Sequence, residues 1–277
     1  MLIAQISDFH IRPDGQMAYE GLQTNTMTRR AIATVAALDP APDCVLVTGD
    51  LADCGRPEEY ALVADMLSAL PMPVFVIPGN HDRRETMREV MAPKFPYLSQ
   101  SPDFLHYTIE DLPVRLIGLD TVQPGEDGGA ICERREAWLG ERLAEGDGRP
   151  TFVFTHHPPF PVGVHGMDIM MCVVGDGFRD MIRSHAEIER VACGHYHRPI
   201  TTRFAGTVGF VAPGVAHQVA LDLRPGEPNR FIFEPPAFAL HAWSPQTGVV
   251  SHVVPIGDFG PAHDFITDVD YPGKNET

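Results

Sequence analysis

Five short motifs combine histidine, carboxylate and amide side chains in a way that permits metal chemistry. They are Asp8-Phe9-His10, Gly49-Asp50, Gly79-Asn80-His81-Asp82, Thr155-His156-His157-Pro158 and Gly194-His195-Tyr196-His197. Imidazole suits zinc, iron and manganese, whereas Asp and Asn oxygens suit the harder divalent ions. A carboxylate placed between the other groups, such as Asp50, could bridge two ions about 3.5–4 Å apart, the separation found in two-metal catalytic sites.

Each motif alone is weak evidence for a metal. Asp-x-His and Gly-Asp are more often ordinary turns, and His156-His157 could be a core or surface pair. His195 and His197 are more informative, because side chains two residues apart on an extended segment point the same way. The ordered set is far more specific than any member, since the structural explanation needs five independent coincidences. The set therefore predicts a metal centre.

The motifs follow short apolar runs that predict buried strands. These runs cover 2–6, 44–47, 74–77, 151–155 and 188–192. Apolar spacing and helix-start and helix-end signals predict helices over 22–38, 57–70 and 133–143. Further strands are expected at 105–109, 114–119, 201–204, 207–211, 239–243 and 249–254. A βαβ start followed by β-rich sequence predicts an α/β layered fold, with a central sheet sandwich and helices outside.

A change in composition divides the chain near its C-terminal end. The segment 213–236 contains five prolines and lies between strand-like runs. We therefore expect a sandwich made of residues 1–212 and 239–255, interrupted by a cap or oligomerisation insertion over 213–238. Phe231-Ile232-Phe233 would give this insertion an apolar contact surface; the alternative is a cap folded onto its own subunit. Residues 256–277 are polar and are expected to form a loosely held tail.

Length and charge exclude several classes of protein. The chain has 277 residues, 44% of them apolar, which is enough for one large domain. Its formal net charge of −16 argues against a nucleic-acid polymer or an anionic membrane as partner, because such affinity comes from Lys and Arg. No apolar run reaches membrane-spanning length, and no basic leader is visible. Five scattered cysteines are typical of reduced thiols, so a cytoplasmic location is expected.

The ordered motif set resembles the calcineurin-like metallophosphoesterase superfamily over roughly residues 1–255. Within it, the chain resembles the class III cyclic-nucleotide phosphodiesterase and glycerophosphodiesterase group. The narrower match rests on four segments, which are 55–60, 156–159, 213–218 and 235–241. The resemblance implies a four-layer α/β/β/α sandwich with a small cap or oligomerisation hairpin. It also implies a homo-oligomer that hydrolyses small phosphodiesters, such as 3',5'-cAMP or glycerophosphodiesters, by attack of a metal-bound hydroxide.

The resemblance further implies two divalent transition metal ions, with iron, manganese, zinc and cobalt all open. The first ion would be held by Asp8, His10, Asp50 and His197. The second would be held by Asp50, Asn80, His156 and His195, with Asp50 bridging. His81 would lie near the substrate phosphate, where it would stabilise charge or protonate the leaving oxygen. Asn80 would also contact the substrate.

Four further positions bear on the site that the resemblance implies. In related protein phosphatases an Asp at the spacing of Asp53 orients the His of the GNH motif, so an Asp53–His81 pair is expected, or else an Asp in a solvent loop. Cys54 stands where those phosphatases carry a phosphate-binding Arg, which favours diesters over dianionic monoesters. His157 would support the ligand His156 or form a pocket wall. His217 would touch the substrate or pack within its loop.

Two rival interpretations remain. The first is a phosphomonoesterase or nucleotide pyrophosphatase of the same fold. Cys54 disfavours the phosphomonoesterase. A metal-free binding module on this fold should have lost ligands, and here every expected ligand position is filled. The sequence therefore favours a metal-dependent phosphodiesterase.

Overall fold

The computed structural model describes residues 1–19 and 21–265. Part of the expected tail, 266–277, lies outside the described residues. Of the described tail, Ile256 is buried and residues 257–265 are exposed.

The first sheet has five strands in the order β15-β14-β1-β2-β3. Its elements are β1 (Leu2–Ile6), α1 (Thr24–Ala36), β2 (Cys44–Thr48), α2 (Pro57–Leu67), β3 (Val74–Ile77), β14 (Ala237–Ser244) and β15 (Gly248–Pro255). Strands β1, β2 and β3 are parallel, as expected for consecutive βαβ units, and β14 joins β1 antiparallel with Leu2 opposite Ala242. Helix α2 begins at Pro57, which needs no N–H donor in the first turn.

The second sheet has six strands in the order β10-β11-β9-β7-β5-β4. These strands are β4 (Tyr107–Ile109), β5 (Arg115–Leu119), β7 (Thr151–Thr155), β9 (Ile188–Cys193), β10 (Ile200–Phe204) and β11 (Thr207–Val211). Strands β5, β7, β9 and β11 run parallel, so their carboxyl ends meet at one edge. The other helices are α3 (Arg84–Met91), α4 (Glu133–Ala144), α5 (His165–Asp168) and α6 (Asp176–Ser184), with a 3-10 turn at Pro96–Ser99.

Two small ribbons complete the described elements. Strand β6 (Gly129–Ala130) pairs with β8 (Cys172–Val173), and β12 (Gln218–Val219) pairs with β13 (Phe231–Ile232). The second ribbon lies inside the segment 213–238 that the composition sets apart. The assignment of this segment as a separate unit stays a prediction.

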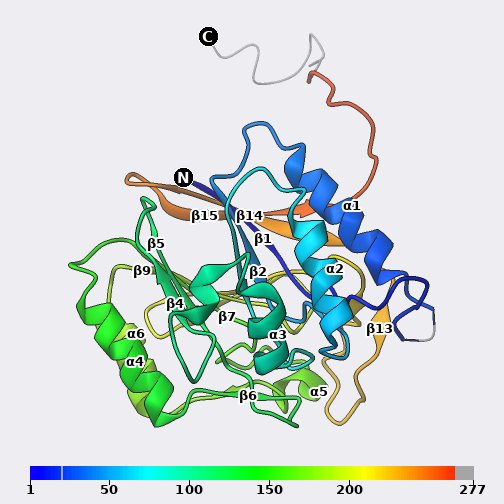
Figure 1. The fold of residues 1–277 in the computed structure, drawn as a ribbon. Coiled ribbons are helices and arrows are strands. Elements are labelled where there is room, and N and C mark those ends of the chain that lie inside the picture. The colour runs from blue at the N-terminus through cyan, green and yellow to red at the C-terminus, as the bar shows by residue number, and fades with distance from the viewer. Residues whose placement is uncertain (20, 266–277) are drawn as a thin grey trace, which may run out of the picture.

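Two apolar clusters hold the sheets and helices together. The larger one joins Ile3 and Val45 of the first sheet to Phe152 of the second, and it includes buried residues of α1, α2 and α3. The smaller one joins the second sheet to α4 and α6 through side chains such as Leu139 and Phe178. Figure 1 shows α1, α2 and α3 on one side of the molecule and α4 and α6 on the other.

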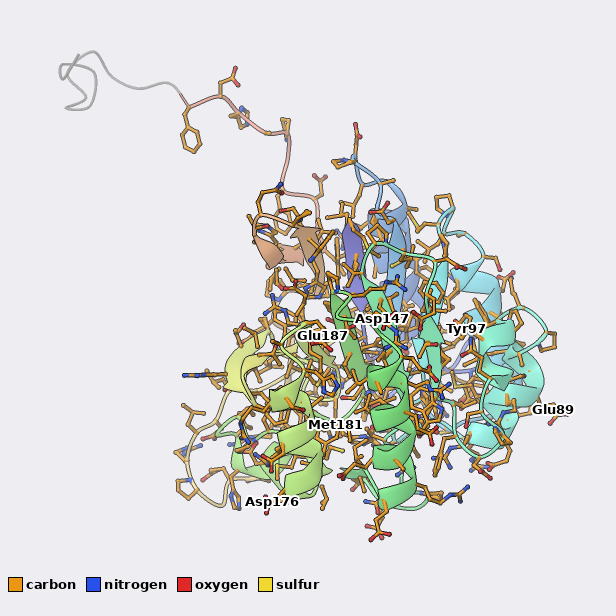
Figure 2. All side chains as sticks on the ribbon, turned by 90° about the vertical axis from the view of Figure 1, so that its left-hand side faces the viewer. Glu89, Tyr97, Asp147, Asp176, Met181 and Glu187 are labelled. Atoms are coloured by element: carbon orange, nitrogen blue, oxygen red, sulfur yellow. The ribbon has the colours of Figure 1, made fainter. Side chains whose placement is uncertain are left out.

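Helices α4 and α6 lie side by side over the second sheet (Figure 2). A Cβ atom at Gly140 of α4 would meet Cε of Met181 on α6 at 3.2 Å, so the glycine permits this close approach. The predicted α/β class is confirmed, whereas the four-layer order of the sandwich stays a prediction. Among the helices of residues 1–19 and 21–265, none combines the length and the apolar character that crossing a bilayer requires.

Candidate metal centre

The structure brings all seven predicted metal ligands to one edge, where strands of both sheets end. Asp8, Asp50 and Asn80 follow β1, β2 and β3, while His156 and His195 follow β7 and β9. The carboxyl ends of parallel strands commonly form binding sites, because the loops leaving them converge there. The site therefore draws donors from two sheets.

The backbone at this edge is held in an unusual conformation. Five of the seven residues have positive φ angles, namely Asp8 (62°), His10 (47°), Asp50 (51°), His195 (68°) and His197 (48°). This region is sterically unfavourable for residues with a Cβ atom, and such residues cluster at functional sites. Main-chain hydrogen bonds fix the loops here, including His10 N to Asp50 O at 2.9 Å.

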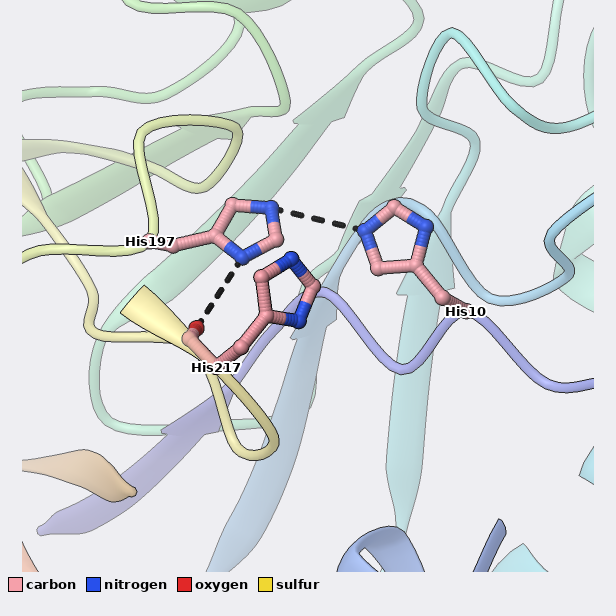
Figure 3. A group of neighbouring side chains, drawn as sticks. All are labelled: His10, His197 and His217. Carbon is pink, nitrogen blue, oxygen red and sulfur yellow. Dashed lines mark hydrogen bonds between the residues drawn. The ribbon is translucent and has the colours of Figure 1, made fainter. Parts of the chain in front are cut away.

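The first group of donors contains Asp8, His10, Asp50 and His197, whose ligand atoms lie within 4.8 Å of one another. His10 Nε2 is 3.6 Å from Asp50 Oδ2, and His197 Nε2 is 3.4 Å from Asp8 Oδ1. His197 Nδ1 donates to the main-chain oxygen of His217 at 3.1 Å, which leaves Nε2 with its lone pair (Figure 3). In the same view Nε2 of His197 faces Nε2 of His10 at 3.4 Å.

The second group lies on the other side of Asp50. His156 Nε2 is 3.3 Å from Asp50 Oδ2 and 3.1 Å from Asn80 Oδ1. His156 Nδ1 donates to the main-chain oxygen of Thr48 at 2.7 Å, so in the neutral ring Nε2 is the nitrogen that carries the lone pair. His195 packs beside His156, with ring centroids 5.0 Å apart. Asp50 Oδ2 is therefore shared between imidazoles of the two groups.

Two glycines of the motifs make room for these donors. A Cβ atom at Gly49, where φ is +93°, would collide with the ring of His156. One at Gly79 would collide with Asp50, including its Oδ1 atom. Steric exclusion of a Cβ atom thus explains why the Gly-Asp and Gly-Asn-His motifs begin with glycine.

Two of the proposed donor atoms are left without a hydrogen-bond partner in the described part of the chain. Asp8 Oδ2 and His195 Nε2 are buried and have no hydrogen-bond partner among the described residues. Leaving a buried polar atom unpaired costs about 1–3 kcal/mol. Imidazoles, carboxylates and an amide oxygen with free lone pairs fit the coordination chemistry of divalent transition ions. The residues present therefore fit a metal, and the cluster could bind one.

Burial and charge shift the pKa values of these groups in the metal-free protein. Burial raises the pKa of Asp8 to about 6, and the neighbouring Asp50 adds to this effect. Burial opposes ionisation of Asp50 as well, but His156 and His81 hold the pKa of Asp50 well below its usual range. Burial acts to lower the pKa of His156, yet Asp50 and Asp8 outweigh it and raise this pKa to about 9. A proton on His156 must therefore leave before Nε2 can bind an ion.

His81 and Asp53 lie beside the first group. His81 Nδ1 donates to the main-chain oxygen of Asp53 at 2.8 Å, and the Asp53 carboxylate is 3.6 Å from the same atom. That carboxylate also lies 3.5 Å from His10 Nδ1 and accepts from Arg12 at 3.1 Å. Asp53 is only 14% exposed, so it is not a solvent-loop residue. Arg12 was not predicted from the sequence, where its only signal is its position two residues after His10.

Two adjoining cavities open over the centre. One, of about 380 Å³, is lined by predicted ligands and by Tyr19, Met170, His217 and Phe231. The other, of about 550 Å³, is lined by side chains that include Cys54, Arg83 and Thr86. Asn80, His81 and Asp127 border both cavities. Tyr19, Phe231 and Asp127 were not predicted as wall residues, because no motif in the sequence marks them for this role.

The two remaining predicted histidines are placed differently. His217 lines the smaller cavity, and its ring is 4.4 Å from that of His197. His157 is buried behind His195, with ring centroids 4.6 Å apart, and its Nδ1 lies 2.7 Å from Thr121 Oγ1. His157 is not among the residues that line either of these two cavities.

Comparison with known proteins places this architecture in a family. Residues 1–199 match the model of the calcineurin-like phosphoesterases. The chain is 34% identical to a protein of Arcobacter nitrofigilis named "Probable glycerophosphodiester phosphodiesterase GpdQ", over 100% of this chain and 98% of that protein. It is also 34% identical to a Synechococcus protein named as a probable cyclic nucleotide phosphodiesterase, over 78% of this chain and 81% of that protein.

Solved structures agree on the fold. A dimetal phosphatase from Danio rerio superposes with a TM-score of 0.63 at 15% identity, covering 93% of this chain and 99% of that one. At this low identity the likeness shows the fold alone. The family model and the two relatives also show the family. This chain belongs to the calcineurin-like phosphoesterase family, and it is a hydrolase of that family with a His/Asp cluster that could hold a metal ion.

Proposed function

We propose that this protein hydrolyses small phosphodiesters at a two-metal centre. The observation that carries the proposal is the position of Asp50, whose Oδ2 lies 3.6 Å from His10 Nε2 and 3.3 Å from His156 Nε2. A carboxylate oxygen between two sets of imidazoles is what a bridging ligand requires.

The proposed ligands are those expected from the sequence. Asp8, His10, Asp50 and His197 would hold one ion, and Asp50, Asn80, His156 and His195 the other. Bound ions would supply the Lewis acidity that activates water and neutralises phosphate charge. Iron, manganese, zinc and cobalt are all compatible with this donor set.

His81 would act on the substrate directly. It borders both cavities, and its Nδ1–H is engaged by the main-chain oxygen of Asp53, so Nε2 is the ring nitrogen that would act on the substrate. Burial acts to lower the pKa of His81, but Asp50 and the Asp53 contacts outweigh it and raise the pKa above its usual value. A protonated His81 would stabilise negative charge on the phosphate and give its proton to the leaving oxygen. Asp53 would position His81 through its main chain and carboxylate.

A diester is favoured over a monoester for two reasons. A diester has two arms, and two cavities adjoin at Asn80 and His81. Cys54 cannot form the bidentate hydrogen bonds by which an arginine binds the doubly charged phosphate of a monoester. Arg12 is not free to do so either, because it forms ion pairs with Asp53 and Glu59. The relatives' names support cyclic nucleotides and glycerophosphodiesters as candidate substrates. His217 would line the space for one arm, whereas His157 would support His195 from behind.

The segment 213–238 would serve assembly as well as the site. Phe231, Ile232 and Phe233 are 45%, 42% and 70% exposed, which supports a homo-oligomer in which these side chains are covered. Phe231 also lines the smaller cavity of its own chain. The five free thiols support the proposed cytoplasmic location.

The test is a substrate panel on metal-analysed protein. We expect bis(p-nitrophenyl) phosphate to be hydrolysed with a higher kcat/KM than p-nitrophenyl phosphate. Asn80→Ala should lower kcat/KM at least about a hundred-fold, the scale of losing one charge-stabilising group, and should reduce metal content. A preference for the monoester would support a phosphomonoesterase instead. No turnover with two bound ions would favour a catalytically silent binding module.

A further inference from the structure

We infer that Gln5 is a positioning residue for the metal centre, because its side-chain amide ties together the three strands that present most of the ligands. The inference rests on the proposed two-metal function. Gln5 lies on β1, is fully buried and faces the second sheet. It belongs to none of the five motifs.

Both N–H groups and the oxygen of the Gln5 amide are hydrogen-bonded. Gln5 Nε2 donates to Thr48 Oγ1 at 3.0 Å and to the main-chain oxygen of Cys193 at 2.9 Å. Because Cys193 O is only an acceptor, the amide orientation is fixed, and Gln5 Oε1 must accept from His241 Nε2 at 3.0 Å. His241 in turn contacts Ser251 Oγ through Nδ1 at 2.7 Å. Burial lowers the pKa of His241 to about 3, so the ring is neutral and has one N–H to donate.

Each anchored residue stands just before a proposed ligand. Gln5 precedes Asp8 by three residues, Thr48 precedes Asp50 by two, and Cys193 precedes His195 by two. Strands β1 and β2 belong to the first sheet and β9 to the second. The bond from Gln5 to Cys193 therefore sets the spacing between the ligands of the two sheets.

Thr48 extends this network to the ligands themselves. Its main-chain oxygen accepts from His156 Nδ1 at 2.7 Å and from Ser7 Oγ at 3.2 Å. Its hydroxyl donates to Ser7 Oγ at 2.8 Å. A shift of Thr48 would therefore move His156 and also the segment that precedes Asp8.

Stability alone does not explain a polar group here. The network crosses an apolar core, and the ring of His241 packs between Phe152 and Phe210 at 5.1 Å from each. Replacing both partners of a buried polar contact by apolar groups of similar shape is often nearly neutral for stability, so the fold does not require a polar network here. Such a network restricts the geometry of the elements that it joins, and for Gln5 these elements lead to the ligands.

The test compares variants that remove one contact between the sheets. Gln5→Met keeps the size of the side chain and removes its hydrogen bonds. Tyr107→Phe is the control, because Tyr107 on β4 is fully buried and donates to Val76 O on β3 at 2.8 Å, away from β1, β2 and β9. Mn²⁺ binding is measured by titration, the spacing of the ions by the exchange-coupled signal in electron paramagnetic resonance, and folding by Tm.

We expect Gln5→Met to bind Mn²⁺ about ten-fold or more weakly, the scale seen for residues that orient ligands, and to change the coupled signal. Tyr107→Phe should bind as the wild type does. Thr48→Val keeps the β-branched shape and removes the contact of the Gln5 amide with β2, so it tests this part of the network if Gln5→Met does not fold. Wild-type affinity and coupling in Gln5→Met, or in Thr48→Val where Gln5→Met does not fold, would overturn this inference and leave the proposed function standing. A wild-type protein that does not take up two Mn²⁺ ions would overturn the proposed function itself.

Discussion

Asp8 and Asp120 are both fully buried carboxylates, yet their surroundings differ in kind. Asp120 accepts hydrogen bonds from Arg84 at 2.5 and 3.0 Å and from the main-chain N–H groups of Leu105 and Val122. Asp8 has one oxygen without any partner among the described residues. The hydrogen bonds of Asp120 are supplied by the protein, whereas one oxygen of Asp8 is left without a described partner.

The pKa values follow this difference. Burial acts to raise the pKa of Asp120, but the Arg84 guanidinium outweighs burial and lowers it. At Asp8 burial prevails and raises the pKa to about 6. A buried charge that the fold satisfies is typical of a structural role, whereas an unsatisfied one indicates a missing ligand. The positive φ angle of Asp8 supports the second interpretation for that residue.

The largest effect should come from Asp8→Asn. We expect kcat/KM for the diester to fall by about a thousand-fold or more, since several kcal/mol of charge stabilisation depend on the ions. The folded-state pKa of Asp8, about 6, lies above its ordinary value of 3.8, so the ionised group destabilises the metal-free fold above pH 6. Metal-free Asp8→Asn should therefore melt at the same or a higher Tm than wild type at pH 8. A markedly lower Tm would mean that Asp8 is structural.

The reverse is expected for Asp120→Asn. Removing this charge leaves Arg84 buried and unpaired, which should lower the free energy of unfolding by about 3–5 kcal/mol. The metal content of the folded fraction should stay at the wild-type value, because Asp120 contacts none of the proposed ligands. Denaturant unfolding and metal analysis measure the two quantities. If the variant lost most of its bound metal but kept its stability, Asp120 would belong to the metal centre, as Asp8 does, and would not be structural.

A smaller effect should appear with pH at His106, which accepts from the N–H of Asp120 at 2.9 Å. Burial lowers the pKa of His106 to about 4, Arg135 and Arg84 add to this, and Asp120 opposes it. Below its ordinary pKa of 6.5 the unfolded chain binds a proton that the folded ring does not. Stability should therefore fall by roughly 3 kcal/mol between pH 6.5 and 4.

His106→Gln is the matching variant, because it keeps an acceptor and removes the titrating ring. Its unfolding free energy should decline less than that of the wild type over the same pH range, as followed by urea denaturation. Parallel pH profiles for the two proteins would show that His106 does not contribute.

The sequence predicted the parts of this molecule that depend on local pattern and residue type. Apolar runs predicted β1, β2, β3, β7 and β9 to within a residue at each end, and the motifs after them supplied Asp8 and the other donors. Helices α3 and α6 were not predicted, although α6 buries Phe178 and Ile182 at helical spacing. Their shortness weakens any periodic signal.

Contacts between distant segments could not be predicted from the sequence. Gln5 and Cys193 are 188 residues apart, and Arg84 and Asp120 are 36 apart. Neither pair has a composition or spacing that marks it, because the contact exists only once the sheets have packed. The walls of the cavities were missed for the same reason: Tyr19 and Phe231 meet at 6.1 Å from opposite ends of the chain.

The pairing of β1 with β14 has a consequence for how the chain is made. Ile3 lies opposite His241, 238 residues further along the chain, so the antiparallel partner of the first strand emerges from the ribosome long after that strand. Until then β1 keeps one edge of unpaired N–H and C=O groups, the kind of edge that recruits strands from other chains. Synthesis of this protein therefore includes a long interval in which its N-terminal strand needs protection from aggregation.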